Sequence, residues 1–77
     1  MTDQIPQDPV GLAAWAEVEA AEARVKAEDL RRDAEDSHPY GAQILRMLAA
    51  GEELIAAQLD VIAADPEAAL KQAGGDQ

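Results

Sequence analysis

This chain of 77 residues has no cysteine and no phenylalanine, and only one tryptophan, one tyrosine and one histidine. Without cysteine it forms no disulfide and offers no thiolate to a structural zinc site. With so few aromatic side chains it has few large anchors for a core of its own. Because a domain this short buries only a limited core, the sequence predicts that oligomerisation supplies the missing stability.

Basic residues are also scarce, since 6 Lys and Arg stand against 16 Asp and Glu, for a formal net charge of −10. Phosphate backbones and anionic membranes repel such a chain, and it has no glycine-rich phosphate loop, so direct nucleic-acid binding is not expected. The acidity either keeps an Ala-rich helical protein in solution or forms a surface for a basic partner, such as a nucleic-acid-binding protein whose groove it occupies.

Long apolar runs are missing as well. No stretch approaches the about 20 residues that a membrane-spanning helix needs, and no basic apolar leader precedes the first predicted helix. We therefore expect a cytoplasmic protein that has no membrane partner.

Two Asp-Pro pairs mark predicted helix starts. An aspartate accepts hydrogen bonds from the first free N–H groups of a helix, and proline suits the first helical position. Asp8 with Pro9 predicts a helix over 9–36, and Asp65 with Pro66 predicts a short helix over 66–72. Between them, a proline predicts a turn over 37–40, with Ser37 as a candidate N-cap for a second long helix over 40–64. The predicted single domain is 8–72, with flexible tails over 1–7 and 73–77.

The first predicted helix carries a heptad of small residues. Its members alternate at spacings of three and four, as in the seam along which two helices meet: Ala13, Ala16, Ala20, Ala23, Ala27, Leu30 and Ala34. Alanine at these positions lets another helix approach closely. The opposite side has a second apolar stripe, which indicates a second packing partner: Ala14, Val18, Ala21 and Val25, with Trp15 at its edge.

The second predicted helix carries most of the large aliphatic side chains. Its main stripe is Ile44, Leu48, Ile55, Leu59 and Ile62, flanked by Leu45, Met47, Leu54 and Val61. Gly51 lies at the centre of this stripe, where it costs about 1 kcal/mol relative to alanine. We predict that the alanine seam crosses the stripe there, and a kink or mere tolerance of glycine are the alternatives. The predicted helix-helix close approach is Ala16, Ala20, Ala23, Ala27 and Gly51, in an intrachain core that adds Leu12, Leu30, Leu48, Ile55, Leu59 and Ile62.

Few residues could perform chemistry. The only serine, Ser37, is next to the only histidine, His38, but sequence neighbours on a turn rarely face each other, so nucleophilic catalysis is not expected. Glu35 and His38 have the i, i+3 spacing of carboxylate-bridged di-iron bundles, yet they lie at a helix end. A small carboxylate and histidine metal-binding bundle is therefore the weaker alternative, and we predict no catalytic, metal-binding or cofactor-binding residue and no cofactor.

Together these patterns predict an all-α fold, in which a hairpin of two long antiparallel helices and a short C-terminal helix dimerise into a four-helix bundle. The predicted function is non-enzymatic and works by protein–protein contact, as an adaptor, an assembly factor or an inhibitor. The predicted interaction surface is Trp15, Val18, Val25, Met47 and Leu54. An alternative is an acidic inhibitor or antitoxin-like protein that occupies the basic site of a nucleic-acid-binding partner.

The composition is rich in alanine and acidic residues and lacks Asn, Phe and Cys. In this it resembles many small proteins of GC-rich actinobacteria and their phages. The likeness covers no motif and implies no activity. Because phage-encoded inhibitors of host proteins are often small, acidic and helical, the resemblance favours the inhibitor form of the hypothesis.

Overall fold

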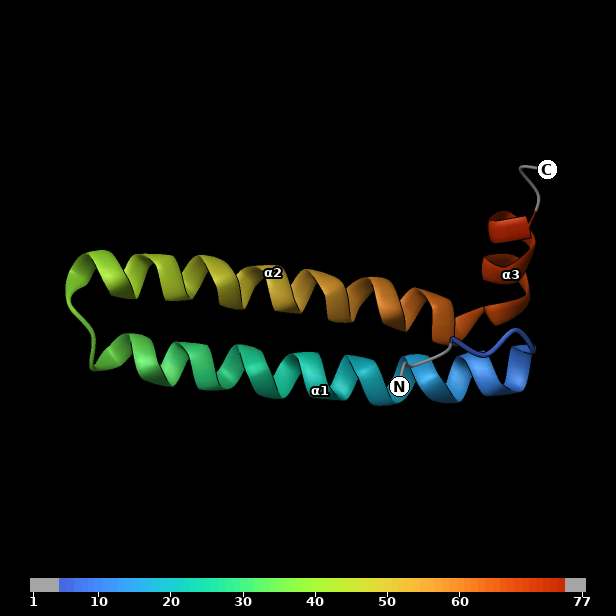
Figure 1. The fold of residues 1–77 in the computed structure, drawn as a ribbon, viewed down its shortest axis with the longest axis horizontal. Helices are drawn as coiled ribbons and strands as arrows, with labels where there is room; N and C mark the ends of the chain where they lie inside the picture. Colours follow the sequence, from blue (N-terminus) through green and yellow to red (C-terminus); the bar gives the residue numbers. More distant parts are fainter. Residues whose placement is uncertain (1–4, 75–77) are drawn as a thin grey trace.

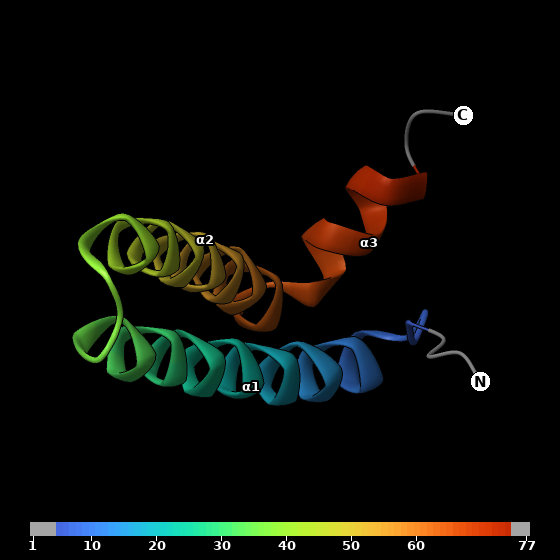
Figure 2. The same ribbon diagram turned by 60° about the vertical axis from the view of Figure 1, so that its left-hand side comes forward.

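The computed structural model describes residues 5–74, which form three helices (Figure 1): α1 (Pro9–Glu35), α2 (Pro39–Ala64) and α3 (Pro66–Gly74). α1 and α2 lie side by side and antiparallel, and α3 rises from the end of α2 on the side away from α1 (Figures 1 and 2). The predicted all-α hairpin with a short third helix is confirmed.

The molecule is elongated, with extents of 47 × 25 × 22 Å and a radius of gyration of 15.4 Å. A compact chain of this length is expected to have a radius of gyration of about 11–12 Å. Two helices in a single layer cannot enclose a central core, so one side of each helix faces solvent. None of the described helices is both long and apolar enough to cross a membrane.

Capping by aspartate explains where α1 and α3 begin. The Asp8 carboxylate accepts a hydrogen bond from the Gly11 N–H at 2.7 Å. The Asp65 carboxylate accepts one from the Ala68 N–H at 3.2 Å. Each cap satisfies a backbone donor that has no partner within its own helix, and each is followed by a proline at the first helical position.

The cap of α2 differs from the prediction. His38 is its N-cap, and the Nδ1 atom of the imidazole accepts a hydrogen bond from the Tyr40 N–H at 3.2 Å. Ser37 does not cap α2, because its hydroxyl donates to the Asp33 carbonyl at 2.8 Å and so satisfies an acceptor at the end of α1. The turn is therefore short, and the side chains of Ser37 and His38 each complete a helix end.

The two tails are only partly described. Residues 5–7 precede α1 without regular structure, while Ala73 and Gly74 belong to α3, which extends past the predicted end at 72. The remaining parts of the predicted tails, 1–4 and 75–77, lie outside the described residues.

Alanine makes up most of the buried residues between α1 and α2. Ten of the described residues are buried, and eight of them are alanines: Ala16, Ala20, Ala23, Ala27, Ala34, Ala42, Ala49 and Ala56, with Leu12 and Leu59 as the others. The three buried alanines of α2, which are Ala42, Ala49 and Ala56, recur every seven residues. α2 therefore presents a seam of small residues to the seam of α1. Methyl side chains are short, and the helices can therefore pack closely.

The predicted packing face of α2 is wrong. Apart from the adjacent residues and backbone of its own helix, no described atom lies within 4 Å of the position that a Cβ on Gly51 would take, so the close approach of the helices is not there. Most of the predicted stripe is exposed to solvent: Ile44, Leu48 and Ile55. Leu59 is buried and Ile62 is half-buried. The physical reason is that the alanine seam of α2, rather than its largest side chains, turns toward α1.

Two ion pairs between described residues favour the orientation of α2 in which its alanine seam faces α1. Arg24 on α1 binds Asp60 on α2, and Arg31 on α1 binds Glu53 on α2. A step of seven residues forward along α1 is matched by a step of seven residues backward along α2, as an antiparallel heptad pairing requires. The arginines and the acids border the alanine seam, so rotating α2 to bury its large aliphatic side chains would separate both pairs.

Candidate interaction surface

The side of α2 that faces away from α1 is apolar and open to solvent. Its large aliphatic side chains are between 51% and 67% exposed: Ile44, Met47, Leu48, Leu54, Ile55 and Val61. Their spacings of three, four and seven place them on one side of a helix, together with Gly51 and Gln58. We refer to these eight residues as the outer face of α2. An exposed apolar strip of this kind is typical of a surface that binds another protein.

Charge avoids the outer face of α2. The helix has four charged residues, Arg46, Glu52, Glu53 and Asp60. At about 100° per residue, all four lie within roughly 60° of the direction of the alanine seam. The chain has 16 acidic and 6 basic residues, yet none of them falls on the outer face of this 26-residue helix. A helix side that only met water would have no reason to exclude charge.

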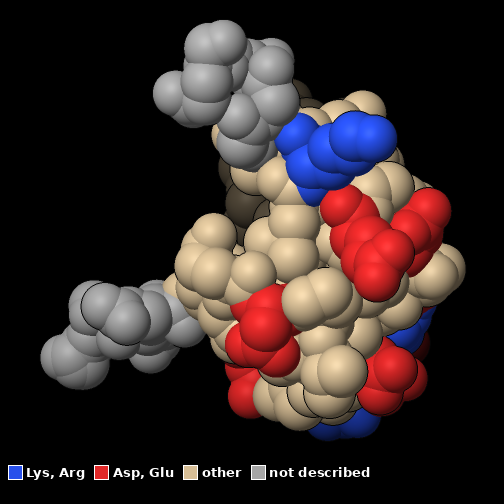
Figure 3. Space-filling view, turned by 90° about the vertical axis from the view of Figure 1, so that its right-hand side faces the viewer, with Lys and Arg blue, Asp and Glu red and all other residues tan. Residues whose placement is uncertain are grey.

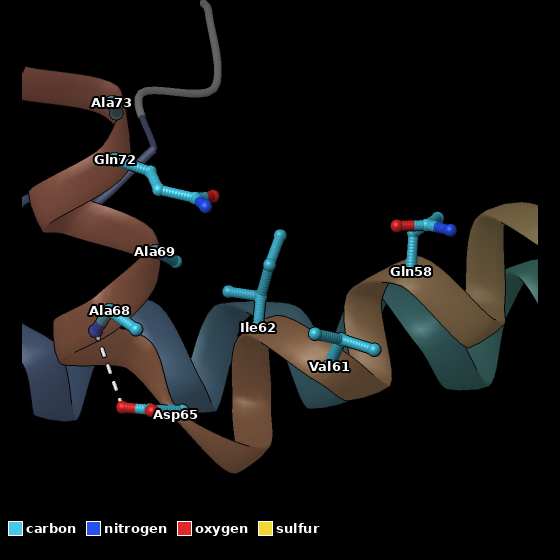
Figure 4. A pocket seen from close by; sticks show the side chains of 8 residues that line it. All are labelled: Gln58, Val61, Ile62, Asp65, Ala68, Ala69, Gln72 and Ala73. Carbon is cyan, nitrogen blue, oxygen red and sulfur yellow. Dashed lines mark hydrogen bonds between the residues drawn. The ribbon is translucent and has the colours of Figure 1, made fainter. Parts of the chain in front are cut away.

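At the C-terminal end of α2 the outer face leads into a cleft against α3 (Figure 4). The cleft has a volume of about 570 Å³ and is lined by Gln58, Val61, Ile62, Asp65, Ala68, Ala69, Gln72 and Ala73. Ile62 stands between the two helices, and the amide side chains of Gln58 and Gln72 lie on either side of it (Figure 4). The Asp65 carboxylate is engaged with the Ala68 N–H. The cleft thus combines an apolar floor with two amide groups.

The residues predicted for the interaction surface do not form one surface. Met47 and Leu54 lie on the outer face of α2, where they are 67% and 63% exposed. Val18 and Val25 are also exposed, but on the side of α1 that faces away from α2. Trp15 is half-buried and packs against the core cluster of the hairpin. It lines a cavity of about 260 Å³ together with Leu12, Ile62 and Leu70, so it serves the chain's own packing.

The apolar stripe of α1 is shorter than the outer face of α2. Around Val25 the surface is shared with Ala21, Glu22 and Lys26. Charged side chains next to the valine raise the desolvation cost of covering it with an apolar partner. We therefore place the candidate site on α2 and not on α1.

The sequence patterns placed Leu48 and Ile55 in the predicted intrachain core, so these two residues were not predicted to lie on the surface. A signal for the correct assignment was present in the second helix itself. Ala42, Ala49 and Ala56 recur every seven residues, and the four charged residues of the helix gather around them. Charges flank a helix pair at the edges of its contact, so they indicate which side meets the other helix.

The turn between α1 and α2 offers no assembled chemical site. Among residues 5–74, no group of three or more His, Asp or Glu side chains could hold a metal ion. The Nδ1 atom of His38 caps α2, and its ring stacks on Tyr40 with 5.8 Å between the ring centroids and an interplanar angle of 7°. The Ser37 hydroxyl is directed at the Asp33 carbonyl. These side chains act as structural caps.

The acidic side chains do not form a continuous groove at the end of the molecule that carries α3. Viewed from that end, they occupy separate patches with uncharged surface between them (Figure 3).

Comparison with models of known protein families, with curated proteins and with solved structures finds no match to this chain.

Proposed function

We propose that this protein is a non-enzymatic interaction module that pairs with a second copy of itself through the outer face of α2. Two hairpins joined in this way form a four-helix assembly, with the two α2 helices at its centre and an α1 helix on either side. The observation that carries the proposal is the distribution of side-chain size. Eight of the ten buried residues inside the hairpin are alanines, whereas six of the nine large aliphatic side chains of α2 are exposed and only Leu45, Leu59 and Ile62 are buried or half-buried.

The exposed area supports an interface of ordinary size. The chain exposes 5640 Å². A compact monomer of its mass is expected to expose about 4500 Å². The excess of roughly 1100 Å² is comparable with the about 800 Å² that each partner buries in a standard protein–protein interface.

In such a dimer the surface left for other proteins is mainly that of α1. This helix carries seven acidic and four basic residues. A dimer that displays two copies of α1 fits the role of an adaptor, an assembly factor or an inhibitor. The alternative, an acidic inhibitor of a nucleic-acid-binding protein, has less support, because basic side chains interrupt the acids of α1 and the patches in Figure 3 are separate.

The test is the mass in solution, measured by light scattering, with circular dichroism on the same samples over a dilution series. We expect a helical particle of twice the 8.2 kDa chain mass. Leu54→Glu places a charge on the outer face of α2 and should give a monomer that keeps most of its helicity, because Leu54 makes no contribution to the hairpin core.

Val18→Glu is the matched control. It introduces the same charge at an equally exposed apolar position on the far side of α1 and should leave the mass unchanged. A wild-type chain that is monomeric at every concentration would contradict self-association. Dissociation by Val18→Glu and not by Leu54→Glu would move the interface to α1.

A further inference from the structure

We infer that the α2 helices of two copies pack against each other in antiparallel orientation, with the two-fold axis beside Gly51. The inference rests on the self-association proposed above and adds the geometry of the contact. It commits the outer face of α2 to one occupant, the same face of a second copy. Four features of the described chain lead to this arrangement.

The first feature is the symmetry of the outer face around Gly51. Leu48 and Leu54 lie three residues before and after it, and Met47 and Ile55 lie four residues before and after it. In an antiparallel two-fold contact, residue i meets residue j of the other copy and residue j meets residue i. An axis at Gly51 therefore pairs Leu48 with Leu54 of the second copy, and Met47 with Ile55 of the second copy.

The second feature is Gly51 itself, which has no role within its own chain. Its φ is not positive, and apart from the adjacent residues and backbone of its own helix no described atom lies within 4 Å of the position of a Cβ. A glycine in the middle of a helix still costs about 1 kcal/mol relative to alanine. On a two-fold axis the missing side chain lets the two helices approach closely, flanked by leucines that cover the contact from both sides.

The third feature is the position of α3. α2 runs from Pro39 to Ala64, so Gly51 is next to its midpoint, and an axis there overlaps two α2 helices along their whole length. α3 rises across the end of the outer face (Figures 1 and 2) and would obstruct a helix that continued beyond Ala64. With the axis at Gly51, the α2 helix of the second copy begins beside α3, so it does not have to extend past it.

The cleft between α2 and α3 then has an occupant. Tyr40, at the start of α2, is 76% exposed. In this register it faces Ile62 of the second copy, which lies in the cleft of about 570 Å³. A tyrosine combines an apolar ring with a hydroxyl that needs a hydrogen-bond partner. The apolar floor of the cleft and the amides of Gln58 and Gln72 match both parts (Figure 4).

The fourth feature is charge. Each copy carries a formal net charge of −10, so two copies repel each other wherever their acids come close. The outer face of α2 is a long uncharged side of the hairpin, and it allows two such chains to meet without desolvating a charge. A basic partner would instead be attracted to the acidic residues elsewhere on the chain.

Cysteine cross-linking tests the geometry, because the natural chain has no cysteine. Ile44 and Gln58 are exposed and lie seven residues on either side of Gly51, so Ile44→Cys and Gln58→Cys leave the hairpin contact intact. The two variants are unfolded together, refolded as a mixture and oxidised. Since random mixing makes about half of the dimers mixed, about half of the chains should form the disulfide-linked heterodimer.

Each variant oxidised alone should remain uncross-linked. In the antiparallel arrangement the two copies of residue 44 are about 21 Å apart along the helices. A disulfide needs Cα atoms within about 7 Å. Val18→Cys, on the far side of α1, is the control that detects random collisions.

The outcomes separate this inference from the proposal beneath it. Self-linking of Ile44→Cys in a dimer would show a parallel contact and overturn the antiparallel axis, while self-association would stand. A dimeric mass without the mixed disulfide would also overturn the axis, and a monomeric mass would overturn both the axis and the self-association.

A substitution of Tyr40 tests the cleft. Tyr40→Ala should raise the dissociation constant of the dimer about tenfold. An unchanged dissociation constant would show that Tyr40 does not occupy the cleft between α2 and α3.

Discussion

Arg24 of α1 and Asp60 of α2 form an ion pair across the hairpin, and Arg31 and Glu53 repeat it seven residues farther along each helix. All four side chains are about half exposed, so each pair is expected to contribute only about 0.2–1 kcal/mol. Their main effect is to favour one register of α1 against α2. A slip of the helices by seven residues would retain only one of the two pairs, and a slip of three or four residues would separate both.

Reversing one of these pairs should therefore restore what breaking it loses. Arg24→Asp places two acids opposite each other and should lower the free energy of unfolding by about 1 kcal/mol. Adding Asp60→Arg should recover most of this loss in urea unfolding followed by circular dichroism. Arg32 and Asp29, whose pair at 3.2 Å lies within α1, provide the control reversal, which should not affect the register. Failure of the double variant to recover would remove the register role of Arg24.

Enlarging one alanine of the seam should separate the helices. Ala20 is buried between α1 and α2, whereas its neighbour Ala21 is exposed. We expect Ala20→Leu to lower the free energy of unfolding by about 1–3 kcal/mol through overpacking. Ala21→Leu adds the same side chain to the open side of α1 and should change it by less than about 0.5 kcal/mol. Equal effects of the two substitutions in thermal or urea unfolding would argue against a close-packed seam.

Two glycines should respond differently to substitution by alanine. A Cβ on Gly11 would lie 2.8 Å from an oxygen of the Asp8 carboxylate, so Gly11→Ala displaces the N-cap of α1. Loss of a cap costs about 1 kcal/mol, which outweighs or cancels the better helix propensity of alanine.

Gly51→Ala adds a methyl group in open space and should stabilise the monomeric hairpin by about 1 kcal/mol. The comparison is made by thermal unfolding at concentrations where the chain is monomeric. If both substitutions stabilise it, Asp8 does not depend on the space beside Gly11.

Salt should strengthen the self-association and so distinguish it from binding to a basic partner. Two copies that each carry a formal net charge of −10 repel each other at low ionic strength. Raising the ionic strength from 0.01 M to 0.15 M shortens the screening length from about 30 Å to about 8 Å. Sedimentation or light scattering should show a lower dimer dissociation constant in the higher salt. A contact that depends on opposite charges would weaken under the same change.

The sequence was sufficient to predict the helices and the side of α1 that forms their contact. Aspartate followed by proline sets the start of α1 and of α3, because both residues act within a single turn of helix. The alanine heptad of the first helix also indicated its buried side, since small residues at seam spacing are typical of a helix that packs closely against another. The cap of α2 was misassigned because Ser37 and His38 are both able to accept a backbone hydrogen bond, and only the backbone path decides between them.

The rotation of α2 could not be obtained from hydrophobicity alone. Large apolar side chains indicate a side of a helix that can pack, but they do not say whether the packing partner lies in the same chain. Leu48 and Ile55 were assigned to the intrachain core on this ground, yet both are exposed. What decides the rotation is the size match between Ala49 and the alanines of α1, together with ion pairs that depend on three-dimensional proximity.

A core of methyl groups also governs how the hairpin responds to temperature. Unfolding of a single chain exposes less new apolar surface than is usual for its length, because eight of its ten buried residues are alanines. The heat-capacity increase on unfolding follows the apolar area exposed, so it should fall below the roughly 1 kcal/mol/K typical of a 77-residue protein. A small increase makes the curve of stability against temperature shallow, which leaves the single hairpin similarly stable in the cold and at moderate heat.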